Sequence, residues 1–357
     1  MRVRILCRLP AQGYSGGRLA TITMAEGLAM AGADVDILTD AVPEMYAEFK
    51  PFSRVRLRTT DLRNLAPWAD RSIDVVVIIP ALNDYYCHGE FLRHAIECNA
   101  RAVLLNFETP NWFNAVSPFK RDPRGWIGWE VVSEYADMIV SISAEGTRWA
   151  REFYLKAPKK CLFEHCHPGI NSVLCDQVPA PPVRKKQIVF LTRLSPHKGY
   201  DMLAPLIGAG LGGYTLVINR SLGTEPDGAF DKWRAQFEKD GVALSLKTNI
   251  GSAEKFALFK ESALNYFPTR FEGYGLPPLE AAYCGCPTAC SDLPVLREVG
   301  GGAYAYADPT NSEAMRRAVA EALGNGEALG REYDRLARIA RIEEYGARNV
   351  HLFEKLF

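Results

Sequence analysis

The sequence lacks a long apolar run and lacks any surplus of charge. No window approaches the roughly 20 apolar residues that a membrane-spanning helix needs. The 42 basic residues are matched by 42 acidic ones, whereas proteins dedicated to nucleic acid usually carry a basic excess. We therefore expect neither a membrane span nor a nucleic-acid partner.

An export signal and paired metal-binding cysteines are also missing. The first ten residues contain an apolar run too short for a secretory signal, which favours a cytoplasmic protein. The nine cysteines lie scattered in apolar segments, and the groupings 161–166 and 284–290 lack the CxxC spacing of a zinc site. We expect reduced, structural thiols and no bound metal.

One acidic pair could suggest a metal. Asp34 and Asp36 are separated by a single residue, as in some metal-binding acid pairs. Their alternation with Val35 and Ile37 instead predicts a strand that has one side facing solvent. We assign them no ligand role.

Short apolar stretches alternate with helical patterns along the chain, an order typical of parallel sheets covered by helices. The 357 residues are about twice a typical domain. The proline- and charge-rich residues 176–186 interrupt the alternation and predict a linker. We therefore expect an α/β protein with two Rossmann-like, doubly wound domains, at 1–175 and 187–338. The expected strands cover 2–9, 34–39, 55–58, 74–79, 102–106, 138–143, 160–164, 187–191, 214–219, 243–247, 263–267, 288–291 and 303–307; the expected helices cover 19–31, 90–98, 145–154, 230–239, 253–261, 312–323 and a final pattern at 331–357, kinked near Gly346.

The stretch Pro268 to Glu280 predicts an anion site. It follows the apolar strand pattern 263–267, and Pro277 can open a helix but not continue one. Gly273 and Gly275 let the backbone approach a ligand closely, and the free N–H groups of the following helix favour negative charge. A phosphate would fit there.

Two carboxylates, Glu272 and Glu280, flank this loop with seven residues between them. Alone, Glu280 would be interpreted as part of a helix cap and Glu272 as a solvated loop acid. Both acids together with the glycines, the prolines and the preceding strand favour a functional interpretation.

The residues 268–287, PTRFEGYGLPPLEAAYCGCP, resemble the signature of family 4 glycosyltransferases, which are retaining enzymes of the GT-B fold. The resemblance implies that Glu280 binds the ribose of a nucleotide and that Glu272 faces the transferred sugar. The backbone groups that would bind sugar hydroxyls and phosphate belong to Gly273, Tyr274, Gly275 and Leu276.

A second match is 191–199, LTRLSPHKG, at the end of the first strand after the linker. Arg193 and Lys198 resemble the cationic clamp of this family. The chemistry needs such cations, because charge builds on the phosphate oxygens when a nucleoside diphosphate leaves. Taken singly, both would be ordinary surface cations.

Gly16 and Gly17 follow the first strand and resemble the glycine loop that approaches the donor from the other domain. Paired glycines alone are a weak signal. Many family members carry an acceptor-side histidine after the strand at 102–106, but here Asn106 and Glu108 stand in that region. Either could orient the acceptor, although a loop acid that caps a turn is equally compatible.

Residues 107–129 combine aromatic and basic side chains. This composition suits a saccharide platform or peripheral contact with the inner face of a membrane that carries a lipid-linked acceptor. The alternative, slightly favoured, is that these aromatics pack into the edge of the first domain.

The resemblance implies two domains facing each other across a cleft, with a final helix at 339–357 packing back on the first. It implies transfer of a hexose from a nucleotide sugar to a saccharide or lipid-linked saccharide, with retention and without a metal or other cofactor, in the synthesis of a surface polysaccharide such as lipopolysaccharide. A GT-B-like nucleotide-sugar epimerase and a non-catalytic nucleotide-sugar-binding subunit are the alternatives.

Overall fold

The computed structural model describes residues 1–12, 15–84, 86–219 and 229–357. The chain divides into two compact units. Unit 1 comprises residues 1–115, 120–171 and 341–357, and unit 2 comprises residues 116–119 and 172–340. The domain boundaries expected from the sequence remain predictions, because a division into compact units does not measure independent folding.

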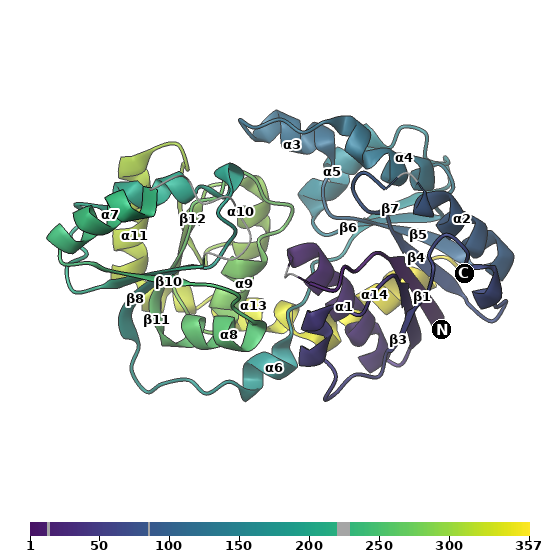
Figure 1. The fold of residues 1–357 in the computed structure, drawn as a ribbon, viewed down its shortest axis with the longest axis horizontal. Coiled ribbons are helices and arrows are strands. Elements are labelled where there is room, and N and C mark those ends of the chain that lie inside the picture. Colours follow the sequence, from purple (N-terminus) through teal and green to yellow (C-terminus); the bar gives the residue numbers. More distant parts are fainter. Residues whose placement is uncertain (13–14, 85, 220–228) are drawn as a thin grey trace. The chain divides into compact units, whose positions relative to one another are not determined.

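Unit 1 is built on a seven-stranded sheet in the order β3-β2-β1-β4-β5-β6-β7 (Figure 1), with every neighbouring pair parallel. Helices α2, α4 and α5 share a core with this sheet. The strands are β1 (Arg2–Cys7), β2 (Asp34–Thr39), β3 (Arg56–Thr59), β4 (Val75–Ile79), β5 (Arg101–Asn106), β6 (Met138–Ser141) and β7 (Leu162–His165); the helices are α1 (Gly16–Met30), α2 (Cys87–Cys98), α3 (Pro110–Val116), α4 (Ile127–Ser133), α5 (Ala144–Phe153) and α14 (Ile342–Glu354).

Unit 2 has a six-stranded parallel sheet in the order β10-β9-β8-β11-β12-β13. Counted from β8, this is the 3-2-1-4-5-6 order of a Rossmann fold, which places ligands at the carboxyl ends of the strands. The strands are β8 (Lys185–Phe190), β9 (Thr215–Asn219), β10 (Ala243–Lys247), β11 (Ser262–Phe267), β12 (Thr288–Ser291) and β13 (Ala305–Ala307); the helices are α6 (Ser172–Gln177), α7 (Ala229–Lys239), α8 (Ser252–Glu261), α9 (Leu276–Tyr283), α10 (Pro294–Gly300), α11 (Ser312–Gly324), α12 (Gly326–Gly330) and α13 (Tyr333–Ala340).

The expected strands all occur, each within two residues of its predicted ends. The expected α/β architecture of two doubly wound sheets is thereby confirmed. Helices α3, α4, α6, α10 and α12 were not predicted, and α6 and β8 extend into the two ends of the predicted linker. Among the described residues, no helix has both the length and the apolar character to cross a membrane.

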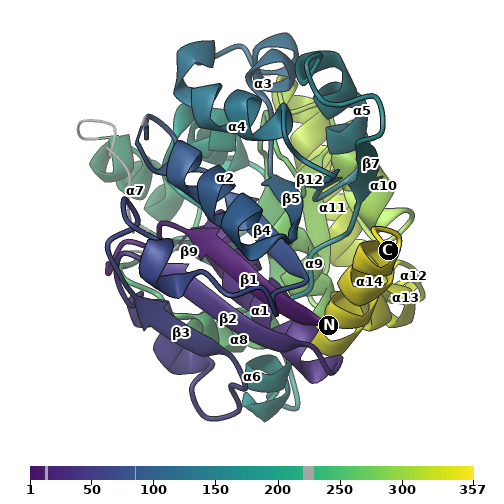
Figure 2. The same cartoon turned by 90° about the vertical axis from the view of Figure 1, so that its right-hand side faces the viewer.

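The final helical pattern is broken, but not where the sequence suggested. The break lies at Arg341, whose extended backbone (φ −61°, ψ 137°) separates α13 from α14. Gly346 lies inside α14, so the interruption of the pattern does not fall at this glycine. A Cβ on Gly346 would lie 1.8 Å from the carbonyl oxygen of Gly27, and a Cβ on Gly27 would lie 2.5 Å from that of Ile342. These glycines let α1 and α14 cross in backbone contact, and Figure 2 shows the two helices side by side.

The strand at Asp34–Thr39 also differs from expectation. Asp36 is buried, not on a solvent-facing side, because β2 is covered on both faces. Its carboxylate accepts two hydrogen bonds from Arg4 on β1, at 2.9 and 2.7 Å, directly across the strand pair. His94 of α2 approaches the same guanidinium, with 3.0 Å between Nε2 and Nη1. The negative charge of Asp36 is therefore balanced by Arg4 within the sheet.

Candidate functional site

Two loops of unit 2 come together at the ends of neighbouring strands. β8 pairs with β11, so the segments 191–199 and 268–275 leave the sheet next to each other. The Arg270 amide donates to the carbonyl of His197 at 2.7 Å, and the Thr269 hydroxyl donates to the same oxygen at 3.2 Å. The structure therefore joins the two sequence motifs.

Gly199 makes this approach possible. Its φ is +70°, and a Cβ at this position would lie 1.9 Å from the carbonyl oxygen of Pro268. A second link fixes the pair of loops, because the Arg270 guanidinium donates to both carboxylate oxygens of Asp201 at 2.7 Å. The backbone around the candidate site is thus held before any ligand arrives.

Lys198 and Glu272 form an ion pair inside this assembly. The Lys198 Nζ lies 2.6 Å from Glu272 Oε1, and the side chains are 19% and 9% exposed. Both residues were predicted site residues, and they come from different loops. The structure therefore brings a cation and an acid from two separate sequence motifs into direct contact.

Glu280 has a partner that the sequence did not suggest. It lies in the second turn of α9 with 1% of its side chain exposed, and its Oε1 accepts from Lys255 Nζ at 2.6 Å. Lys255 belongs to α8, which packs against α9. No motif links these two positions in the sequence. The pair becomes visible only when α8 and α9 are packed together.

Helix α9 begins where the loop turns. Gly275 precedes its first residue with φ +98°, and a Cβ there would lie 2.4 Å from the Leu296 side chain. Tyr274 is buried against the body of the unit, whereas Gly273 and Leu276 are partly exposed. The predicted order of strand, glycine-broken loop and helix is confirmed. Because Pro277 and Pro278 carry no N–H and the Leu279 N–H donates to the Gly275 carbonyl, the first turn of α9 offers a ligand the N–H of Leu276.

Arg193 lies apart from these ion pairs. It follows β8 and is exposed. Among the residues that the structure describes, its side chain makes no hydrogen bond or ion pair. The guanidinium is therefore available to a ligand that reaches the end of β8.

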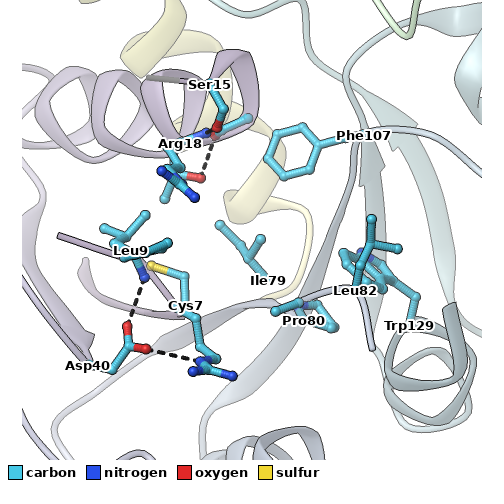
Figure 3. A pocket seen from close by; sticks show the side chains of 15 residues that line it. Cys7, Leu9, Ser15, Arg18, Asp40, Ile79, Pro80, Leu82, Phe107 and Trp129 are labelled. Carbon is cyan, nitrogen blue, oxygen red and sulfur yellow. Dashed lines mark hydrogen bonds and ion pairs between the residues drawn. The ribbon is translucent and has the colours of Figure 1, made fainter. Parts of the chain in front are cut away.

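In unit 1, the predicted glycine loop borders a hollow of about 410 Å³. Helix α1 begins at Gly16, and the Ser15 hydroxyl caps it by accepting from the Arg18 amide at 3.3 Å. A Cβ on Gly17 would lie 3.7 Å from the ring of Phe107, which follows β5. Figure 3 shows this ring reaching toward the start of α1. The lining is mainly apolar: Cys7, Leu9, Pro10, Ile79, Pro80, Ala81, Leu82, Phe107 and Trp129, with Arg8, Ser15, Gly17, Arg18, Thr21 and Asp40.

Asp40 and Arg8 supply polar groups at the hollow. Asp40 accepts from the Leu9 amide and from Arg8 Nε, both at 3.0 Å (Figure 3). The hydrogen bond to Asp40 raises the pKa of Arg8 above its usual value, so the guanidinium stays charged. A neighbouring acid and base of this kind can accept from and donate to sugar hydroxyls.

Asn106 and Glu108 are both engaged within unit 1. Asn106 is fully buried; its Nδ2 donates to Ser141 Oγ at 3.1 Å, and its Oδ1 accepts from the Tyr154 hydroxyl at 2.9 Å. Glu108 pairs with Arg121. Neither side chain lines the hollow, whereas Phe107 between them does. Their acceptor role stays a prediction.

The aromatic segment 107–129 is mostly core. Trp112, Phe113, Trp126 and Trp129 are each at most 6% exposed, which favours the packing alternative. Arg121 lies over the Phe113 ring at 3.7 Å. The nine cysteines are all buried and free, as expected for structural thiols.

Comparison with known proteins agrees with this geometry. Residues 223–342 match the family model described as "Glycosyl transferases group 1". The O-antigen chain mannosyltransferase B of Escherichia coli is 42% identical over 57 residues, which are 16% of this chain and 15% of that protein. The serotype-specific mannosyltransferase WbdA of Escherichia coli is 38% identical over 96 residues, or 27% of this chain and 12% of that protein. The matched segments thus span less than a sixth of these relatives' own length.

Solved structures resemble the whole chain. The sucrose-phosphate synthase of Thermosynechococcus elongatus has a TM-score of 0.73 at 15% identity, covering 100% of this chain and 99% of that one. Anabaena HepE, solved with UDP and glucose, has a TM-score of 0.72 at 12% identity, covering 99% and 100%. At sequence identities this low, the structural similarity supports the fold alone. Residues 223–342 are therefore similar to the glycosyl transferases group 1, and the chain has the expected GT-B fold.

Proposed function

We propose that the protein is a retaining glycosyltransferase of the family 4 type, which moves a hexose from a nucleotide sugar to a saccharide or lipid-linked saccharide without a metal. One observation carries the proposal: the loops after β8 and β11 are joined, and they present Lys198 and Glu272 at the carboxyl edge of a Rossmann sheet, with Glu280 on the helix α9 that follows. Such an edge is where open α/β sheets hold nucleotides.

In this reaction the bond between the anomeric carbon and the donor phosphate oxygen breaks, and the acceptor oxygen bonds to the same carbon on the same face. The acceptor proton passes to an oxygen of the departing diphosphate, so no strong protein base is required. Arg193, Lys198 and the Leu276 N–H that opens α9 would stabilise the charge on that diphosphate. These groups supply the positive charge for which many transferases use a metal ion.

Lys198 would change partners during the cycle. Its ammonium now lies on Glu272 at 2.6 Å, and a lysine carries three donors on a flexible stem. When a diphosphate is bound, the Lys198 ammonium would therefore donate to the diphosphate as well as to Glu272. Glu272 would then face the sugar hydroxyls, for which an ionised carboxylate is a good acceptor.

The relatives favour mannose as the hexose, since both matched Escherichia coli proteins are named as mannosyltransferases, one of them for the O-antigen chain. We infer that the acceptor is a growing surface polysaccharide of this kind. The hollow of unit 1 is our candidate for the acceptor. Its apolar wall with Phe107 suits a sugar ring, and Asp40 and Arg8 suit its hydroxyls.

The test is donor turnover by the purified protein. A panel of nucleotide sugars is offered with and without oligosaccharide acceptor, and both the nucleoside diphosphate and the glycosylated product are measured. Lys198→Ala and Glu272→Ala should each lower turnover by about 100-fold, the usual effect of removing one group that stabilises developing charge. Lys185→Ala is the matched control, because its ion pair with Glu261 is exposed at the opposite end of β8.

Three other results would change the assignment. Conversion of the donor sugar without an acceptor would identify an epimerase. Binding of the nucleotide sugar with no turnover by the isolated chain would identify a non-catalytic subunit. Full activity of folded Lys198→Ala and Glu272→Ala proteins would show that the site lies elsewhere.

A further inference from the structure

A lysine outside every recognised motif lies on the most buried acid of the candidate site. Lys255 Nζ is 2.6 Å from Glu280 Oε1, with 19% of the lysine side chain exposed and 1% of the glutamate side chain. We propose that Lys255 is a positioning residue for the nucleotide: it holds the Glu280 carboxylate ionised and oriented so that Glu280 binds the ribose diol. This inference rests on the proposed function and deepens it.

The need for such a cation follows from burial. An ionised carboxylate removed from water is costly unless a charge or several hydrogen bonds compensate it. Without compensation, Glu280 would be driven toward its neutral acid, which offers less acceptor capacity and carries a proton of its own. Two adjacent ribose hydroxyls need two acceptor sites, and the ionised carboxylate provides them.

Lys255 also fixes the orientation of the Glu280 carboxylate. Lys255 reaches Glu280 from α8, whereas the backbone of Glu280 is fixed by α9, so the carboxylate is held from two helices. The bond is to one oxygen, Oε1. A ligand group can therefore approach the carboxylate without displacing the lysine, because a carboxylate has about four lone-pair sites.

A second ion pair, between the end of β10 and α8, shows what an incidental contact looks like. Lys247 and Glu254 lie 3.1 Å apart with side chains 44% and 46% exposed. Exposed pairs of this kind contribute little. The pair Lys255–Glu280 differs in burial, and it joins an acid of the motif to a residue that no motif predicts.

The experiment measures how strongly the protein prefers ribose. Binding of ADP, GDP, UDP and CDP, and of the 2′,3′-dideoxy form of each, is measured by titration calorimetry. The parent should bind one or more ribonucleotides about 100-fold more tightly than the dideoxy forms, since two hydrogen bonds to a charged acceptor are lost. In Lys255→Met this ratio should fall to near one, as it should in Glu280→Gln.

Three further variants separate positioning from simple support. Lys255→Arg should keep most of the ratio, because it keeps the cation. Lys255→Met/Glu280→Gln buries no uncompensated charge, so it should fold and should lose no more of the ratio than either single change. Lys247→Met should behave as the parent.

The outcomes are distinct. If Lys255→Met, or the double variant when the single one fails to fold, keeps the parent's ribose preference while only its melting temperature changes, Lys255 is a structural support and the inference is overturned. If the parent binds no nucleoside diphosphate, the proposed donor site itself fails, and this inference fails with it.

Discussion

The two units share the Rossmann order of their strands but use buried charge differently. In unit 1 the buried cluster of Arg4, Asp36 and His94 lies across the middle of the sheet. In unit 2 the buried acids Glu272 and Glu280 lie in the loop and helix beyond the strand ends, each against a lysine. Charge within a sheet can only fix the pairing of its strands, whereas charge beyond the strand ends can meet a ligand.

The binding surfaces differ in the same way. The hollow of unit 1 has a mainly apolar lining, with one Arg8–Asp40 pair at its edge. The joined loops of unit 2 carry cations and a helix start. An apolar hollow suits a sugar ring and a cationic edge suits a diphosphate, so each unit is suited to a different half of the proposed reaction.

The largest expected effect concerns stability of unit 1. Gly346→Ala would place a Cβ 1.8 Å from the carbonyl oxygen of Gly27, so α14 must move, and we expect a loss of about 3 kcal/mol or more in the free energy of unfolding. Urea unfolding followed by tryptophan fluorescence measures it, because five of the six tryptophans lie in unit 1. Gly89→Ala in α2 is the control: its Cβ would meet nothing within 4 Å, so it should be neutral or slightly stabilising. Equal behaviour of the two variants would refute the close helix crossing.

Next in size is the loss of a ligand-facing cation in unit 2. Arg193→Ala should lower the rate of donor turnover by about 100-fold. Its melting temperature should match the parent's, because the side chain is exposed and has no partner among the described residues. Arg317→Ala, an exposed cation on α11 with only a 3.8 Å ion pair, should leave turnover unchanged. A large loss of stability in Arg193→Ala would show that this cation supports the fold, and the contrast between structural charge in unit 1 and ligand-facing charge in unit 2 would not hold.

The buried cluster of unit 1 predicts a dependence of stability on pH. Burial, and next the charge of Arg4, lower the pKa of His94 from 6.5 to about 4. Between these values the unfolded chain takes up a proton that the folded chain does not, so the free energy of unfolding falls as the pH drops from about 6.5 to 4. The loss should be on the order of 2 kcal/mol.

Urea unfolding between pH 7 and 4 measures this effect. The decline should be smaller in His94→Gln, which has no titrating ring. A decline of the same size in the parent and in His94→Gln would assign the acid sensitivity to other groups.

The smallest expected effect tests the apolar hollow. Phe107→Ala should raise the acceptor KM by about tenfold, the value of one contact between a ring and a sugar face. The affinity for the nucleotide should not change, since the proposed nucleotide site belongs to unit 2. Tyr135→Ala, which removes a ring that is 61% exposed on unit 1, is the control. A changed nucleotide affinity with an unchanged acceptor KM would reverse the proposed division between the units.

The sequence predicted the fold through local signals. Apolar strands such as 75–79 and the linker prolines are visible in any short window, and the motif around Glu272 is contiguous. The same holds for the turn at Gly275, which the glycine and the prolines that follow it indicate in the sequence. Features that depend on residues close together in the sequence could therefore be predicted.

What the sequence could not provide depends on contacts between distant residues. Lys255 lies 25 positions before Glu280, and an isolated lysine on a helix gives no signal. Asp36 alternates with apolar neighbours as an exposed residue would, and only Arg4 on the adjacent strand permits its burial. Gly346 looks like a helix breaker until Gly27 is placed against it. The break at Arg341 has no local cause in the sequence at all.

The contact between Gly27 and Gly346 also bears on synthesis of the chain. Unit 1 is discontinuous: its first segments leave the ribosome early, but α14, which covers α1, is made after all of unit 2. Domains generally fold as units during synthesis. Unit 2, being almost one continuous segment, can complete its core first, while α1 waits with an uncovered apolar face. During synthesis, the N-terminal half is therefore the part of this chain that is exposed to aggregation. Its exposure ends when α14 has been translated and covers α1.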